Sequence, residues 1–190
     1  MNQGLRWRIV SLQVITMLVL GFCAGFAFWG AGFINGMVHD ELVAQKISFP
    51  PASEIKAGGA LDPAVFSQEI RDVAGQQVDT GDKARIYAND FIAVHLNKVA
   101  NGQTYSQVSA AAQADPKNTA LANQANTLFK GETLRGLLLN AYGWSQVALY
   151  AFFAAIGLTI AAIAVLATLV YEVLVAPRTV KATRPQPIPA

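Results

Sequence analysis

The apolar positions of the chain gather in two long uncharged stretches, residues 9–38 and 136–171, on either side of a polar middle. Each stretch is longer than the roughly 20 apolar residues that a helix needs to cross a bilayer core. The pattern therefore predicts a two-pass membrane protein with transmembrane helices at 9–35 and 146–171. Residues 1–8 and 172–190 are then the two ends of the chain, the second of them rich in proline, and residues 36–145 form the domain between the spans.

Helical spacing continues beyond both spans and predicts helical stalks. After the first span, apolar residues keep this spacing until Phe49-Pro50-Pro51 ends the run. The residues concerned are Met37, Val38 and Leu42. Before the second span the spacing i, i+3, i+4, i+7 is held by Leu134, Leu137, Leu138 and Ala141. Tyr142 and Trp144 follow at the position where aromatic side chains favour the membrane interface, so lipid crossing should begin near Gln146.

The middle of the chain carries the start and stop signals of short helices. Expected starts are Asp62-Pro63, Thr80, the capping box of Thr104 with Gln107, and Asp115-Pro116; expected ends are Gly75, Asn101-Gly102 and Gly131. The helix that follows Thr80 has one apolar face, made of Ala84, Ala88, Phe91, Ile92, His95, Leu96 and Val99. No stretch alternates as a strand would. The expected fold is all-α, with two transmembrane helices and an extracytoplasmic domain of about four short helices.

Composition and charge support a membrane location and give it a direction. The chain is 53% hydrophobic and only 14% charged, whereas about a quarter of the residues of a soluble domain are charged. Basic residues flank both spans on their outer ends, namely Arg6 and Arg8, and Arg178, Lys181 and Arg184. Because such residues are retained on the cytoplasmic side, both termini should be cytoplasmic in the cell membrane. A cleaved signal peptide is the alternative for the N-terminus, but the apolar run is long and no A-x-A site ends it.

Small residues form stripes on both predicted spans. At about 100° per residue, one face of the first span holds Gly21, Gly25, Gly32 and Gly36, beside an aromatic stripe of Phe22, Phe26, Trp29 and Phe33. The second span has two such faces, one with Ala148, Ala151, Ala155 and Ala162, the other with Ala154, Gly157, Ala161 and Ala164. Such faces let helix backbones pack closely in lipid. One could pair the two spans and another could receive a second copy or a different membrane protein; the alternative is that it meets only lipid.

Few residues in the chain could carry chemistry. His95 lies on an apolar helix face, which favours a buried core histidine over a ligand contact, and His39 lies on the first stalk. The two histidines have no metal-binding spacing, and Cys23 is the only cysteine. Arg135 could pair with Glu132, meet lipid headgroups or contact a partner. No catalytic, cofactor, metal or nucleic-acid motif is present, so none of these sites is predicted.

Several segments carry a resemblance to a known family: residues 75–84, Tyr87 to Ile92 with His95-Leu96, Thr104-Tyr105, and the run Gly131 to Asn140. With these the chain resembles an uncharacterised family of two-pass membrane proteins from actinobacteria, over nearly its whole length. Some members carry a ring-opening dioxygenase label. That chemistry needs two histidines and a carboxylate in a sheltered pocket, a set for which this chain has no spare histidine. The resemblance implies topology and envelope location, and no activity.

Two classes of function follow from these observations. The first is a structural or accessory membrane protein that docks a larger envelope or respiratory complex through the small-residue faces of its spans and its outer domain. The second is an extracytoplasmic module that binds or senses a small ligand near His95. An enzyme of any kind comes third.

Overall fold

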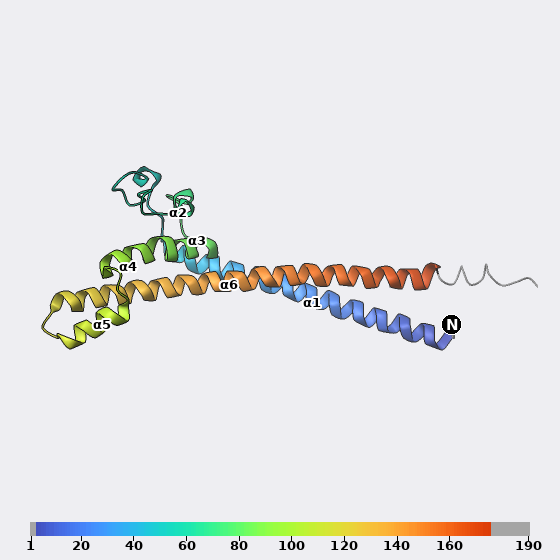
Figure 1. Cartoon of the computed structure of the whole chain (residues 1–190). Helices are drawn as coiled ribbons and strands as arrows, with labels where there is room; N and C mark the ends of the chain where they lie inside the picture. The colour runs from blue at the N-terminus through green and yellow to red at the C-terminus, as the bar shows by residue number, and fades with distance from the viewer. Residues whose placement is uncertain (1–2, 176–190) are drawn as a thin grey trace, which may run out of the picture. The chain divides into compact units, whose positions relative to one another are not determined.

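The computed structural model describes residues 3–175, and over these residues the protein is all-helical, with 79% helix and no strand. Figure 1 shows two long helices, α1 (Gln3–Ala44) and α6 (Thr119–Val170), with the short helices between them in the chain. The short elements are η1 (Ala52–Glu54), α2 (Gln68–Asp72), α3 (Gly81–Ile86), the π-helical segment η2 (Tyr87–Ile92), α4 (Ala93–Ala100) and α5 (Tyr105–Ala114). A further π-helical segment, η3 (Tyr171–Val175), follows α6. The basic residues at 178, 181 and 184 lie outside the described residues.

Helices α1 and α6 are long enough and apolar enough to cross a membrane. They contain 42 and 52 residues. At 1.5 Å per residue these lengths are about 63 Å and 78 Å, against a hydrocarbon core of about 30 Å. The two helices therefore extend about six and nine turns beyond what a span requires, which leaves room for the predicted stalks. The chain divides into two compact units, residues 1–32 with 149–190 and residues 33–148, and both long helices contribute to each.

The first unit is an antiparallel pair formed by the start of α1 and the end of α6. Its inward positions on α1 recur at alternating steps of three and four residues, which is coiled-coil spacing. These buried and half-buried residues are Val10, Gln13, Met17, Leu20, Ala24, Ala27 and Ala31. Ala24, Ala31 and Ala155 are almost fully covered, at 5%, 3% and 0% exposure. Alanine at these positions lets the two backbones approach closely.

Polar contacts are found near the chain ends of the same unit. The Arg6 guanidinium donates a 2.9 Å hydrogen bond to the Glu172 carbonyl and lies 3.8 Å from the Glu172 carboxylate. Gln13 donates to the Thr168 hydroxyl at 3.5 Å. Farther along, the rings of Phe28 and Phe152 meet edge to face, 5.6 Å apart. In each of these pairs the two residue numbers add up to nearly the same value, as expected for two antiparallel helices that keep one register.

The second unit has a hydrophobic core built from every element of residues 33–148 except η1. Buried members include Val38 on α1, Ile70 on α2, Leu96 on α4, Val108 on α5 and Leu128 on α6. Two backbone hydrogen bonds, from Phe49 to Gln76 and from Val78 to Ile47, join the segment after α1 to the segment before α3 as an isolated antiparallel bridge. Among the described residues no polar or charged side chain is buried.

Two predicted helix starts are confirmed by cap geometry. The Thr80 hydroxyl accepts a hydrogen bond from the Lys83 backbone N–H and begins α3. Thr104 and Gln107 form the full capping box at the start of α5. The expected end at Asn101-Gly102 is also correct, since both residues have positive φ, 50° and 78°, after α4.

Two other predicted starts are wrong. Asp62 accepts backbone N–H bonds from Gly58 and Ala64 and so fixes a turn; α2 begins only at Gln68, where Ser67 is the cap. Likewise Asp115 ends α5, and α6 begins at Thr119 after the Asn118 side chain accepts from the Leu121 N–H. In both places an Asp-Pro pair makes a turn, and a Ser or Asn a few residues later starts the helix.

Gly131 does not end a helix as predicted, because α6 runs through it without interruption. A Cβ at this position would overlap Cδ2 of Leu96 and lie 2.9 Å from its Cδ1. Glycine is therefore present because α4 packs tightly on α6 at this point. Gly131 therefore marks a position where two helices approach closely, and not the end of a helix.

The expectation of a buried His95 is also wrong, and η2 explains why. A π-helical turn uses one more residue than an α-helical turn, so the positions after it rotate by about one residue. Ala84, Ala88, Ile92, Leu96 and Ala100 form the buried face at steps of four, while His95 is exposed. Val99, also expected inside, is 41% exposed for the same reason.

Candidate functional site

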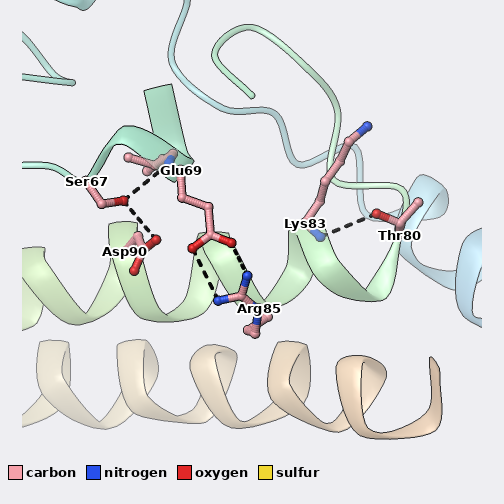
Figure 2. Close-up of polar contacts among 7 residues, drawn as sticks. Ser67, Glu69, Thr80, Lys83, Arg85 and Asp90 are labelled. Atoms are coloured by element: carbon pink, nitrogen blue, oxygen red, sulfur yellow. Dashed lines mark hydrogen bonds and ion pairs between the residues drawn. The ribbon is translucent and has the colours of Figure 1, made fainter. Parts of the chain in front are cut away.

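Several polar contacts of the second unit tie the segment before α2 and α2 itself to α3 and η2, as Figure 2 shows. Arg85 forms a two-pronged ion pair with the Glu69 carboxylate, which raises the pKa of the guanidinium, and it lies 5.9 Å from the ring centre of Tyr142. The Ser67 hydroxyl donates to Asp90 at 3.0 Å and accepts from the Ile70 N–H at 3.3 Å. Within residues 3–175 these side chains pair with one another and with the backbone, so the network holds α2 and the segment before it against α3 and η2.

Arg135, a predicted contact residue, lines a small polar hollow. Its guanidinium donates to Glu132 at 3.3 Å on the same helix and to Asn89 at 3.2 Å on η2. Its Nε is buried and has no partner among the described residues. The hollow has a volume of about 390 Å³ and is also lined by Tyr105 and Ser106 at the start of α5. Glu132 neutralises Arg135 in the same hollow, so no net charge selects a ligand there.

The two histidines have separate partners. His39 contacts the Asp79 carbonyl through Nδ1 at 2.9 Å, and His95 contacts the Phe91 carbonyl through Nδ1 at the same distance. The His95 ring also lies 4.4 Å from that of Phe91 and 5.7 Å from that of Phe66. Neither histidine lines the hollow at Arg135. Within residues 3–175 no cluster of three or more His, Cys, Asp or Glu side chains could hold a metal ion.

An apolar groove lies between the outer parts of α1 and α6 in the second unit. We call it the stalk groove, and its volume is about 450 Å³. Its apolar lining consists of Met37, Val38, Leu42, Ile47, Leu134, Leu137, Leu138, Ala141 and Trp144, and its polar lining of Glu41, Gln45 and Asn140. The apolar residues include both stalk patterns found in the sequence. The polar ones were missed, because a groove between segments almost a hundred residues apart leaves no local pattern.

In the first unit, the structure places the predicted helix-packing residues on different sides of the helix pair. Gly21, Gly25, Gly32 and, in the second unit, Gly36 are exposed, and a Cβ at any of them would meet nothing within 4 Å. Ala155 is buried, and Ala151 and Ala162 are half-buried on the same helix face. Ala154, Gly157, Ala161 and Ala164 are exposed. The glycine face of α1 and this second face of α6 are therefore not covered by any of residues 3–175.

A second apolar groove follows the glycine face in the first unit. It has a volume of about 500 Å³ and is lined on α1 by Gly21, Gly25 and Phe28 among others, and on α6 by Ala162 and Ile163. Beside it, Phe22 and Phe26 are 75% and 62% exposed and stack on each other with ring centres 6.4 Å apart. A smooth glycine surface therefore runs next to a raised aromatic surface on one helix.

Comparison of the chain with family models, with curated protein sequences and with solved structures gave no match.

Proposed function

We propose that this chain is a two-pass integral membrane protein whose residues 9–35 and 146–171 cross the cell membrane. In this arrangement residues 36–145 lie outside and both termini in the cytoplasm. The exposed apolar side chains support it, because Phe22, Trp29, Phe153 and Ile160 are each about 60% exposed or more on α1 and α6. Large apolar side chains that are exposed along a long helix are stable in lipid and unfavourable in water. Arg6 and Arg8 before the first span support the orientation.

Within that membrane, we propose a structural or accessory role in which the glycine face of α1 docks another membrane protein of a larger envelope or respiratory complex. The observation that carries this is the open space over Gly21, Gly25, Gly32 and Gly36. Glycine in a helix interior costs about 1 kcal/mol relative to alanine in water. Among residues 3–175 nothing packs into the space over these four glycines, so they contribute no contact to the described part of the fold. A partner helix that approaches closely would turn them into contact surface.

The outer unit supports docking more than ligand sensing at His95. His95 is exposed, its Nδ1 contacts a backbone carbonyl of its own helix, and it lines neither the hollow at Arg135 nor the stalk groove. The run Gly131 to Asn140 holds α4 through Gly131 and forms part of both hollows.

Crosslinking in native membranes tests the docking role. A tagged full-length chain is crosslinked, purified and analysed for stoichiometric partners by mass spectrometry. Gly25→Leu with Gly32→Leu should abolish the crosslink, because the new side chains fill the space that a partner backbone would occupy. The matched control is Gly30→Leu, since Gly30 lies about 180° from Gly21 around the same helix and also faces open space.

The outcomes separate cleanly. Loss of a stoichiometric partner in the double variant and its retention in the control support docking through this face. Crosslinks between copies alone, lost in the same variant, would make the partner a second copy. Unchanged crosslinking in the double variant would refute the role of the glycines. Orientation is tested separately, since an alkaline phosphatase fusion at Asn101 should be active in cells.

A further inference from the structure

The stalk groove has an apolar floor and an open apolar side. Val38, Leu42 and Leu138 form the floor and are 3–6% exposed, whereas Leu137 and Met37 on the open side are 65% and 42% exposed. Its volume of about 450 Å³ is in the range of about 300–1,000 Å³ that is typical of small-ligand sites. An apolar chain laid in this groove would cover the exposed side chains of Met37 and Leu137, and the burial of this apolar surface would be favourable.

The polar side chains of the groove have no partner within residues 3–175. Glu41, Gln45 and Asn140 are exposed, and none of their side chains forms a hydrogen bond or an ion pair there. This contrasts with Glu69, Asp79 and Glu132, each of which pairs with a basic side chain of the same unit. Free polar groups around an apolar floor are what a bound amphiphile requires.

Charge decides which head group fits. Of the residues that the structure describes, Glu41 is the only charged one that lines the groove, and no lysine, arginine or histidine among them does. A carboxylate and amide oxygens accept hydrogen bonds from an ammonium group, and the ring of Trp144, which also lines the groove, is an aromatic surface of the kind that attracts cations. The groove therefore complements a cation that can donate several hydrogen bonds.

We propose that the stalk groove binds a bilayer lipid with a primary-amine head group. One acyl chain runs outward from the bilayer over Met37 and Val38, and the ammonium group is held farther out, at Glu41 with Gln45 and Asn140. This inference rests on the proposed membrane function, because it needs the stalks to lie at the lipid surface. Trp144 is two residues before the predicted start of the second span, at the depth where the head groups of the outer leaflet are found.

Fluorescence of Trp144 provides the test. The full chain is made with Trp7→Phe and Trp29→Phe, which leaves Trp144 as the only tryptophan. It is placed in lipid nanodiscs of phosphatidylglycerol in which a small fraction of the lipid has dibrominated acyl chains. The brominated lipid is either phosphatidylethanolamine, which has the amine, or phosphatidylglycerol, which lacks it. Bromine quenches a tryptophan only at close range.

The proposal expects the brominated amine lipid to quench Trp144 about threefold more strongly. One partly exposed charge pair contributes a difference in affinity of about this size. Glu41→Gln should remove the difference between the two lipids. The matched control Asp40→Asn, at the neighbouring acid that does not line the groove, should keep it. Far-ultraviolet circular dichroism of each variant confirms that the helices are intact.

Equal quenching by both lipids, or a difference that survives in Glu41→Gln, would overturn the proposal while the membrane location stands. The groove would then hold unselected lipid or a helix of a partner protein. No quenching by either lipid would place Trp144 away from the bilayer and would overturn the predicted boundary of the second span as well. The two failures are thus distinguishable.

Discussion

Replacing Gly81 with alanine should destabilise the second unit, because the first turn of α3 packs directly against α6. A Cβ at Gly81 would overlap Oγ and Cβ of Ser145 and lie 3.3 Å from Cα of Tyr142. Neither Ser145 Cβ nor the backbone can rotate away, so the helices must separate. Overpacking of this kind costs about 1–3 kcal/mol, and the better helix propensity of alanine returns at most about 1 kcal/mol. The net loss is about 1–2 kcal/mol.

Thermal unfolding of the detergent-solubilised full chain, followed by circular dichroism, measures this loss. At about 4–8 °C per kcal/mol for a domain of about 100 residues, Gly81→Ala should lower the midpoint by roughly 4–16 °C. Gly136→Ala is the matched control, since a Cβ there meets nothing within 4 Å and should raise the midpoint by a few degrees. In a Ser145→Gly background, Gly81→Ala should lose most of its effect. A midpoint raised equally by both alanines would refute the close-packing argument.

Two further predictions concern single polar contacts of the second unit. Thr104→Ala removes the cap of α5 and should lower the free energy of unfolding of the second unit by about 1 kcal/mol. Thr104→Ser keeps a hydroxyl at the cap and should be nearly neutral. Urea titration of the full chain measures both effects. The hydrogen bond from Lys83 lowers the pKa of Asp79 below its usual 3.8, so this carboxylate stabilises the fold above that value and stops doing so as the pH falls through its lowered pKa. The stability difference between the native chain and Asp79→Asn should therefore be full at neutral pH and vanish in strong acid, and a constant difference across the acid range would contradict it.

Several helices and helix starts could be predicted from the sequence, whereas the contacts between helices could not. Apolar runs and cap residues such as Thr80 and Thr104 are local signals, so the long helices and the starts of α3 and α5 could be predicted. Gly131 could not be read correctly, because a glycine that ends a helix and one that admits Leu96 look alike in sequence. Nothing local distinguishes η2 from an α-helix either, and its extra residue is what turns His95 outward.

The same limit applies to the grooves and to the choice of packing face. Glu41 and Asn140 are ordinary polar positions of two stalks, and only the tertiary fold places them around one apolar floor. The sequence likewise shows small residues on several sides of each span but not which side is used within the chain.

The side that α1 uses is informative about the rest of the molecule. Its contact with α6 is made through alanines such as Ala24 and Ala31, although Gly25 and Gly32 one residue further on would allow a closer approach. Alanine supplies a methyl group to pack and is a better helix former, so it suits a permanent contact within one chain. The glycines would be replaceable by alanine at no cost if only lipid covered them, because lipid chains adapt to either surface. The backbone of the proposed partner would not adapt in this way, so its close approach would favour glycine over alanine at these positions.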